Sequence, residues 1–506
     1  MYCSLPPEYV SLRRSLRELQ DLDFALSLMY WDRQTYMPDG GAIARGDQAA
    51  TLQRLLHEKA TAPELGDTLE ALRDFEDSQP YSSIEASTIR IARRDYTRKV
   101  AVPSEFEARL AAHQNVCYAA WAAAREASDF AIVRPALEKT LDLSLEFASF
   151  FPQAAHPADP AIDAIDPGAT VGQLRRLFGQ LREPLVELLG AIEASGRSRD
   201  DTLLRQPFET NIQQDFCRKT LERIGYDFQR GRLDETMHPF TVSCSADDVR
   251  LTNRVIPEDL SESVFCSLHE MGHGLYEQGL DPALRGTPLA AGTSSGMHEA
   301  QARLWENTIG RSRAFWECCF PWLQGAFIRQ LGKASVGEFY SAVNVVRRSA
   351  QRTSADEVTY NLHVTIRFEL ELAMLEGKLA IADLPDAWNA AYARDLGVTP
   401  PNDREGVLQD VHWYGHRIGG QFQGYALGNL IAAQLYETAL QTHPEIPVDL
   451  ERGRFSTLLD WLGRNVYRYG RKFTATELLE RTTGRVLQIE PLVDGLTRKY
   501  EQVYGL

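Results

Sequence analysis

The 506-residue sequence has few cysteines and no long apolar run. Its seven cysteines are odd in number and show no C-x-x-C spacing, so we expect reduced thiols rather than a disulfide framework. No apolar stretch reaches the roughly 18 residues of a membrane-spanning helix, and residues 1–7 lack the hydrophobic region of a signal peptide. We therefore expect a cytoplasmic protein that does not bind membranes.

Basic residues are scarce relative to acidic ones. The chain has 54 Lys and Arg against 70 Asp and Glu, which gives a formal net charge of −16 at pH 7. Nucleic acids are bound through clustered basic residues, and no such cluster stands out, so we expect no nucleic-acid partner. The length and the 44% hydrophobic content allow a large core, as in a soluble enzyme.

Most apolar residues follow a helical spacing, which predicts a mainly α fold. Thr474 and Glu477 form a capping-box pattern that predicts the start of a late helix. The proline-containing stretch 152–167 cannot be a continuous helix, and we interpret it as a long loop within one catalytic unit, 1–506. The clearest helical stripe lies near the N-terminus and consists of Leu12, Leu16, Leu19, Leu22 and Leu26.

Two segments differ from this helical pattern. Residues 238–244 and 249–255 contain β-branched residues in partial alternation around a turn-like Ser245 to Asp248, which predicts a β-hairpin. An extended peptide could pair with its edge as an added strand, and such pairing would read the backbone rather than the side chains. The alternative is a surface hairpin that contacts no substrate.

The most informative motif is H-E-x-x-H, formed by His269, Glu270 and His273. Two histidines four residues apart lie on one face of a helix and can bind one metal ion, while the glutamate takes a proton from water that the metal activates. Gly272 and Gly274 each cost a helix about 1 kcal/mol relative to alanine, so their presence indicates that other groups approach the backbone there. The alternative is a buried helix with two core histidines.

A zinc hydrolase needs a third protein ligand, and Glu299 is the best candidate. A loop of small residues, 285–296, separates the motif from a second helical segment that carries Glu299 in its first turn. A helix packed against the first could direct this carboxylate to the metal. Glu277, one turn beyond His273, either orients a ligand or is a solvated surface charge.

The residues around Glu299 resemble the second metal-site segment of the M32 metallocarboxypeptidases, the thermostable carboxypeptidase Taq family. This chain has Ala300 where the family usually has serine, and Gln351 where it has isoleucine. The resemblance covers nearly the whole chain, in motifs that follow one another in the family's order: Trp31 to Pro38, His238-Pro239-Phe240, Asp248 to Thr252, Gly296 to Asn307, Arg352 to His363, and Gly406 to Trp413.

The resemblance implies a large multi-helix metallopeptidase fold with a deep active-site groove and a small β-hairpin or sheet near the metal. Its N-terminal helical part would span about 1–150 and its motif-bearing part about 230–430. It also implies broad specificity and a homodimer. The expected cofactor is one divalent ion per chain, Zn2+, with Co2+ also compatible with these ligand types.

An exopeptidase needs a fixed cation for the terminal carboxylate of its peptide substrate, and a guanidinium suits this task. Arg352 and Arg250 are the candidates, although Asp356 and Asp248 lie near enough in sequence to pair with them instead. The oxyanion of the reaction needs further donors, for which polar residues in the motif segments are candidates, each equally open to a packing role. The remaining predicted substrate contacts are His298, His238, His412, Gln409 and Tyr425.

We thus predict a carboxypeptidase that acts on peptides with a free C-terminus. Two alternatives remain. One is a metallo-oligopeptidase that cleaves internal bonds, since a neighbouring helical family shares the motif. The other is a non-catalytic peptide-binding protein with a structural metal, which the presence of Glu270 argues against, because such a site has no use for a base.

Overall fold

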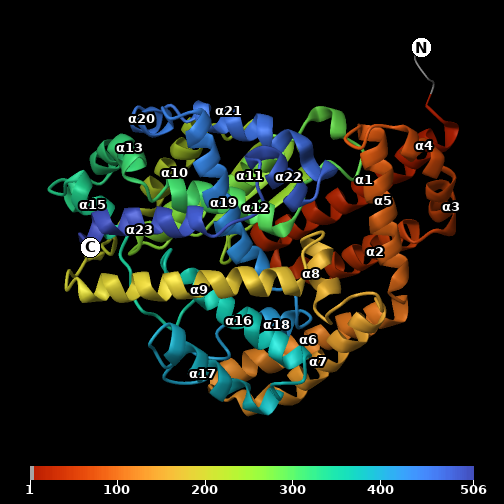
Figure 1. Ribbon diagram of the computed structural model, residues 1–506, viewed down its shortest axis with the longest axis horizontal. Coiled ribbons are helices and arrows are strands. Elements are labelled where there is room, and N and C mark those ends of the chain that lie inside the picture. Colours follow the sequence, from red (N-terminus) through yellow and green to blue (C-terminus); the bar gives the residue numbers. More distant parts are fainter. Residues whose placement is uncertain (1–4) are drawn as a thin grey trace. The chain divides into compact units, whose positions relative to one another are not determined.

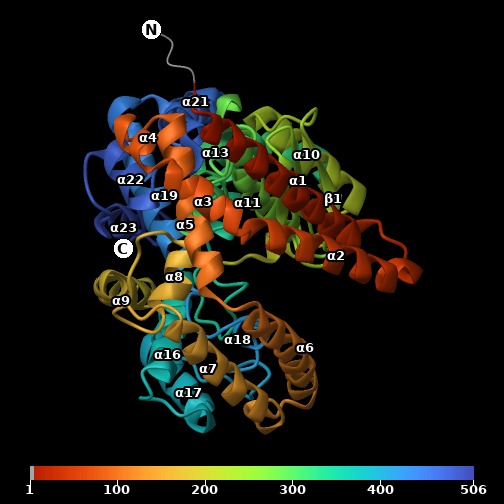
Figure 2. The ribbon, with the colours of Figure 1, turned by 90° about the vertical axis from the view of Figure 1, so that its right-hand side faces the viewer.

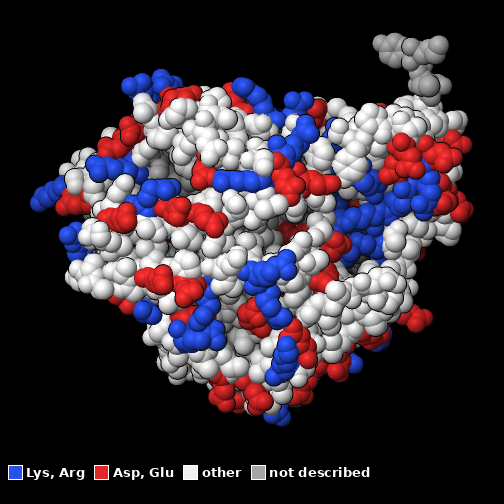
Figure 3. All heavy atoms as spheres, in the orientation of Figure 1, with Lys and Arg blue, Asp and Glu red and all other residues white. Residues whose placement is uncertain are grey.

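The computed structural model describes residues 5–506 and is mainly helical, as predicted (Figure 1). Residues 1–4 lie outside the described residues. The signal-peptide expectation, which concerns residues 1–7, therefore falls partly outside them. Within the described part, none of the helices is long and apolar enough to cross a membrane. Acidic and basic side chains are interspersed over much of the face in Figure 3.

The chain folds into two compact units, each built from segments that are distant in sequence. The first comprises the chain up to Val100, Asp201–Val343 and Leu435–Val486, and the second comprises Ala101–Asp200, Asn344–Gln434 and Leu487–Leu506. The predicted helical part, about 1–150, therefore contributes to both units. That the whole chain acts as one catalytic unit stays a prediction.

The first unit contains the sheet and most of the short helices. Its α-helices are α1 (Pro7–Thr35), α2 (Ala42–Ala60), α3 (Pro63–Ala71), α4 (Arg73–Ser78), α5 (Ile84–Ala101), α10 (Thr210–Ile224), α11 (Leu260–Gln278), α12 (Ser295–Arg303), α13 (Arg313–Ala326), α14 (Ile328–Leu331), α15 (Val336–Ala342), α20 (Ile446–Glu451), α21 (Ser456–Asn465) and α22 (Ala475–Thr483). The other helical turns are η1 (Asp39–Gly41), η3 (Thr202–Leu204), η4 (Pro282–Leu284), η5 (Leu304–Ile309) and η7 (Tyr467–Lys472).

The second unit is helical throughout its described regular structure. Its elements are α6 (Ser104–Ala127), η2 (Phe130–Ile132), α7 (Arg134–Ser149), α8 (Asp159–Ile165), α9 (Val171–Ala194), α16 (Tyr360–Leu375), η6 (Ile381–Asp383), α17 (Leu384–Asp395), α18 (His412–Gly415) and α23 (Glu490–Tyr504). The first part of α19 (Gln423–Thr442) belongs to this unit and its last part to the first unit. The stretch 152–167, interpreted as a loop, contains the short helix α8, because Pro160 falls in its first turn, where proline is tolerated.

The predicted hairpin is confirmed and gains a third strand. Strand β2 (Thr241–Ser245) pairs antiparallel with β3 (Asp248–Asn253), and β1 (Gly231–Glu235) pairs parallel with β3. The order is β1-β3-β2, so β2 lies at an edge. Sequence reasoning missed β1 because its residues, Gly-Arg-Leu-Asp-Glu, lack β-branched side chains.

Apolar stripes account for the packing in each unit. Leu12 and Leu16 of the predicted N-terminal stripe are buried against α3 and α5 in one cluster, and α1 lies beside α2 (Figure 2). In the second unit, Phe106 of α6 and Phe147 of α7 share another cluster, and the two helices lie side by side. The predicted capping box at Thr474 and Glu477 is present at the start of α22.

Candidate functional site

The two motif histidines and Glu299 gather at one point in the first unit. His269 and His273 project from α11, and Glu299 projects from α12. Glu299 Oε2 lies 3.8 Å from the Nε2 atom of each histidine, and one ligand atom from each of the three residues lies within 4.8 Å of the others. The imidazoles are partly exposed, so solvent can reach the position between them.

Glycines allow the two helices to approach each other. A Cβ atom on Gly272 would lie 2.4 Å from the carbonyl oxygen of Gln301 in α12, and one on Gly274 would lie 2.8 Å from Leu251 in β3. The expected close approach of other groups to this part of α11 is therefore confirmed. Ser294 caps α12, and Glu299 lies in its second turn rather than in the first.

Charged neighbours hold the carboxylate ligand in place. Arg303 Nε donates to Glu299 Oε1 over 2.7 Å, which leaves Oε2 facing the histidines. Arg303 Nη1 also donates to Glu306 Oε2 over 3.2 Å. Glu306 is placed by the π-helical turn η5, an irregularity often found at functional sites. The guanidinium thus joins the two carboxylates on this side of the cluster.

The electrostatics of this cluster favour a bound cation. His269 Nδ1 lies 2.8 Å from Glu306 Oε2. Burial lowers the pKa of His269, but the carboxylates of Glu299 and Glu306 outweigh this and raise the pKa to about 9. Burial raises the pKa of Glu306, but Arg303 and His269 outweigh it and lower the pKa to about 2. Two imidazoles and a carboxylate in such surroundings suit a divalent metal.

His273 is supported through a different residue. Its Nδ1 atom lies 2.7 Å from Nδ1 of His298, and Nε2 of His298 lies 2.8 Å from Oε1 of Glu277. Glu277 is only 5% exposed, so it is not the solvated surface charge that we considered. His298, predicted to contact substrate, thus has both ring nitrogens next to protein groups.

Glu270 lies beside the cluster and is 6% exposed. Burial raises the pKa of its carboxyl group. Thr241 Oγ1 on the edge strand β2 lies 2.7 Å from Glu270 Oε2 and 2.9 Å from the Glu270 carbonyl oxygen. The sheet therefore fixes the position of this carboxylate.

Removal of the Thr241 hydroxyl should impair catalysis without changing metal binding. We expect Thr241→Val to lower kcat about 10- to 100-fold, because a hydrogen bond to a charged group is worth about 1.5–3 kcal/mol. Thr241→Ser keeps the donor and should retain most of the activity. Steady-state kinetics on a peptide with a free C-terminus would check this, and equal losses in both variants would contradict it.

The other predicted residues of the first unit lie on or near the sheet. Arg250 on β3 donates through Nε and Nη2 to Asp248, each over 2.8 Å, so the ion pair considered from the sequence exists. Its guanidinium carbon lies 4.3 Å from the centre of the Trp31 ring. His238 is exposed between β1 and β2. The substrate contacts of Arg250 and His238 stay predictions.

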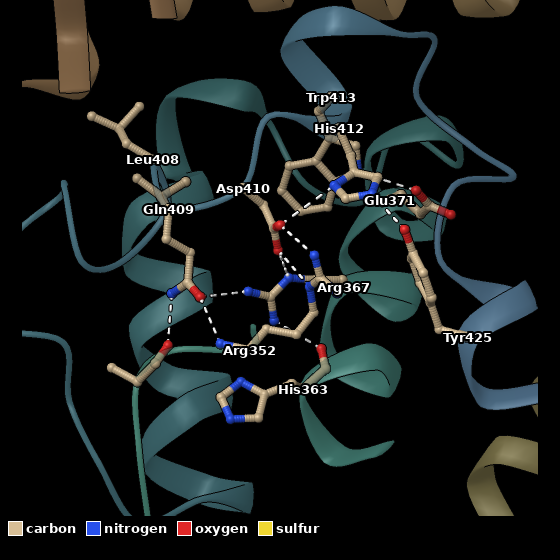
Figure 4. A network of polar contacts seen from close by, with 12 residues as sticks. Arg352, His363, Arg367, Glu371, Leu408, Gln409, Asp410, His412, Trp413 and Tyr425 are labelled. Carbon is tan, nitrogen blue, oxygen red and sulfur yellow. Dashed lines mark hydrogen bonds and ion pairs between the residues drawn. The ribbon is translucent and has the colours of Figure 1, made fainter. Parts of the chain in front are cut away.

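In the second unit, two buried arginines share one carboxylate (Figure 4). Arg352 donates to Asp410 through Nε at 3.0 Å and Nη2 at 2.8 Å, and Arg367 donates to Asp410 through Nε. Arg352 is 7% exposed and Arg367 is fully buried. Asp356, the alternative partner of Arg352 suggested by the sequence, instead accepts backbone N–H groups, including those of residues 347, 358 and 359.

The remaining predicted residues surround this pair. Gln409 Oε1 accepts from the backbone N–H of Arg352 at 3.1 Å and from Arg367 Nη2 at 2.9 Å. His412 Nδ1 lies 3.4 Å from Asp410 Oδ1, and its Nε2 lies 3.1 Å from the hydroxyl of Tyr425 (Figure 4). The structure thus brings Arg352, Gln409, His412 and Tyr425 into one network.

Arg352, Arg367 and Asp410 together carry one excess positive charge. Burial raises the pKa of Asp410, but the two guanidiniums outweigh it and hold the pKa well below its usual range. Among the described residues, Asp410 is the carboxylate paired with either arginine. Of the five N–H groups of a guanidinium, Arg352 directs three to Asp410 and to the Tyr360 hydroxyl. A buried charge needs a partner, so an anion would complete this site.

Sequence reasoning missed several members of both clusters. Asp410 and Glu306 stood inside the quoted motifs but were not singled out. For Glu306 a signal existed, since Glu299, Arg303 and Glu306 are spaced four and three residues apart, which places them on one face of a helix. Thr241 and Arg367 showed no such local pattern.

The chain is similar to known proteins over nearly its whole length. Thermostable carboxypeptidase 1 of Thermus thermophilus is 38% identical over 506 residues, covering 98% of this chain and 99% of that protein. Carboxypeptidase 1 of Bacillus subtilis is 35% identical, covering 97% of each. The crystal structure of the M32 carboxypeptidase from Deinococcus radiodurans R1 is 44% identical, covers 99% of this chain and 100% of that one, and superposes with a TM-score of 0.95.

The family model described as Carboxypeptidase Taq (M32) metallopeptidase matches residues 11–500, which is nearly the whole chain. The predicted mainly α metallopeptidase fold with a small sheet is thereby confirmed. Membership implies a peptide hydrolase that acts on peptides with the help of a divalent metal. The chain belongs to the M32 metallocarboxypeptidases, the carboxypeptidase Taq family.

Proposed function

We propose that this metallocarboxypeptidase removes C-terminal residues one at a time, with broad specificity, and that Glu270 is its general base. The observation that carries the proposal is the arrangement of His269, His273 and Glu299 around one point, with the buried carboxylate of Glu270 beside them. Two imidazoles and one carboxylate are a donor set that would hold a catalytic divalent metal.

The protein side chains have distinct roles in this proposal. A divalent metal held by His269, His273 and Glu299 supplies Lewis acidity, which polarises the peptide carbonyl and makes water easier to deprotonate. Glu270 accepts the proton of the attacking water and passes it to the leaving amine. Thr241 holds the carboxylate of Glu270 in position for both transfers.

The terminal carboxylate of the peptide would be recognised by Arg352. The excess positive charge of the Arg352, Arg367 and Asp410 network supports this role, because a carboxylate would balance it. Gln409 would act by positioning both arginines, while His412 and Tyr425 would line the same network. Arg250 is the second candidate, but its charge is balanced one for one by Asp248, whereas Arg352 shares the carboxylate of Asp410 with Arg367.

Broad specificity would follow from the edge strand β2. Its residue Thr241 contacts Glu270, so a peptide that adds to this edge would be read near the catalytic carboxylate through its backbone. Backbone pairing leaves side-chain choice loose.

A blocked C-terminus should separate an exopeptidase from an oligopeptidase. We expect a mixed peptide set to yield ladders shortened from the carboxyl end in mass spectrometry. The same peptides as C-terminal amides should be turned over at least about 30-fold more slowly, since a lost charged partner costs about 2–5 kcal/mol. Internal cleavage at an unchanged rate would favour the oligopeptidase. A chelator should stop the hydrolysis of both the free and the amidated peptides. A protein that binds these peptides but hydrolyses none of them would favour the non-catalytic alternative.

Further proposals concern the metal, the location and the assembly of the protein. We propose Zn2+ as the metal, with Co2+ as the alternative, because imidazole and carboxylate ligands suit both. The described cysteines, Cys117, Cys217, Cys244, Cys266, Cys318 and Cys319, are free thiols, in keeping with a cytoplasmic location. A homodimer is proposed from the family resemblance. The whole chain, 1–506, is proposed to act as one catalytic unit, since the family match covers nearly all of it.

A further inference from the structure

The two histidine ligands are supported by different numbers of residues. Nδ1 of His269 faces a carboxylate directly, at 2.8 Å from Glu306. Nδ1 of His273 instead faces a second imidazole, at 2.7 Å from Nδ1 of His298. A carboxylate follows only one step later, where Nε2 of His298 lies 2.8 Å from Glu277. We call the residues that connect the Nδ1 atom of each histidine to a carboxylate its arm. The arm of His273 consists of His298 and Glu277, and the arm of His269 consists of Glu306 alone.

The proton positions along this longer arm depend on one another. A neutral imidazole has one N–H and one acceptor nitrogen. The contact between the two Nδ1 atoms needs one donor and one acceptor, so either His273 or His298 carries a proton there. If His298 donated, His273 would carry its own proton on Nε2, the atom that faces Glu299, and could not bind a metal through it. Only donation by His273 leaves its Nε2 lone pair available.

Glu277 decides between these two arrangements. A carboxylate accepts hydrogen bonds but does not donate them. Glu277 Oε1 therefore favours a proton on Nε2 of His298, which makes Nδ1 of His298 an acceptor for His273. The same oxygen accepts the backbone N–H of Gly292 over 3.1 Å, which fixes its position.

We propose that His298 and Glu277 form a relay that positions His273 and keeps it in its metal-binding tautomer. The relay rests on the metal site of the proposed function. In it, both nitrogens of His298 are engaged, so no N–H of this residue remains to stabilise an oxyanion. His298 and Glu277 are thus positioning residues that act through His273.

The packing around His298 holds the ring in the required orientation. A Cβ atom on Gly292 would lie 2.5 Å from Cδ2 of His298 and 2.9 Å from Cε1 of Tyr276, so only glycine fits where the loop crosses the ring. The ring centres of Tyr276 and His298 are 5.2 Å apart. The imidazole is therefore enclosed between this tyrosine and the loop.

The test measures zinc affinity by competition with a chromogenic chelator, using the full-length chain. His298→Phe keeps a ring but removes both nitrogens, and Glu277→Leu removes the acceptor. We expect each to weaken zinc binding about 10- to 100-fold. Glu277→Gln retains an acceptor oxygen and should lose less affinity than Glu277→Leu. Thermal unfolding of the metal-free variants near the wild-type temperature would show that the fold is intact.

A double-mutant comparison distinguishes a relay from local packing. Because His298 and Glu277 act in series, His298→Phe combined with Glu277→Leu should bind zinc no more weakly than the worse single variant. Glu306→Gln alters the other arm, so its effect should add to that of His298→Phe. These two combinations serve as each other's control.

The outcomes separate the relay from the function on which it rests. Unchanged affinity in a folded His298→Phe, or additive losses for His298→Phe and Glu277→Leu, would overturn the relay alone. If His298→Phe does not fold, Glu277→Leu decides the matter, since it leaves the ring in place. A wild-type chain that binds neither Zn2+ nor Co2+ would reject the metal site of the proposed function, and the relay with it.

Discussion

Glu270→Gln is expected to lower kcat on peptides by about 10²- to 10⁴-fold, the usual contribution of a general base. Glutamine has the same shape, and its amide oxygen can still accept the hydrogen bond that Thr241 donates to Glu270 Oε2. The substitution therefore removes the ability to take a proton and little else. Single-turnover and steady-state rates on an unblocked peptide would measure the loss.

Metal content distinguishes this result from damage to the site. The proposed ligands are His269, His273 and Glu299, so Glu270→Gln should retain one metal per chain. A variant that keeps both metal and activity would falsify the role assigned to Glu270. A variant that loses the metal would show instead that Glu270 contributes to binding it.

Arg352→Met should lower kcat/KM for peptides with a free C-terminus by about 10²- to 10³-fold, as expected for loss of a buried charged partner. The substitution leaves Asp410 paired with Arg367, so no carboxylate becomes unpaired and the network should stay folded. Amidated peptides lack the carboxylate that Arg352 would bind, and their slow turnover should not fall further.

Arg348→Met is the matched control. Arg348 precedes Arg352 by four residues and forms an ion pair with Glu193 within the same unit, but it is not part of the network around Asp410. Its loss should leave kcat/KM within about threefold of the wild-type value, because partly exposed ion pairs contribute little. Equal losses on free and amidated peptides in Arg352→Met would contradict carboxylate recognition by Arg352.

Much of the fold follows from local patterns that can be recognised in the sequence. The N-terminal leucine stripe, the capping box at Thr474 and the hairpin around 245–248 were all predicted and are present. Each depends on residues fewer than about twenty positions apart. Side chains share a face at a period of about 3.6 residues in a helix and about 2.0 residues in a strand. Strand β1 escaped notice because its stability comes from pairing with β3 rather than from its own composition.

The proposed metal ligands were predictable only in part. His269 and His273 were predictable because one helical turn separates them, and the glycines between and beside them indicated a close neighbour. Glu299 was a candidate among several carboxylates, and only the packing of α12 against Gly272 shows which one reaches the histidines.

The partners of these residues could not be derived from spacing. Asp356, four residues from Arg352, was the alternative partner suggested by the sequence, but Arg352 pairs with Asp410, 58 positions further along the chain. The predicted substrate contact of His298 stays a prediction, and spacing gave no sign that its ring nitrogens would lie next to His273 and Glu277. The sequence thus determines helices, strands and the types of groups present, because these depend on neighbours in the chain. Pairing of charges and orientation of imidazoles were decided by the packed structure, because hydrogen bonds and ion pairs depend on distance in space.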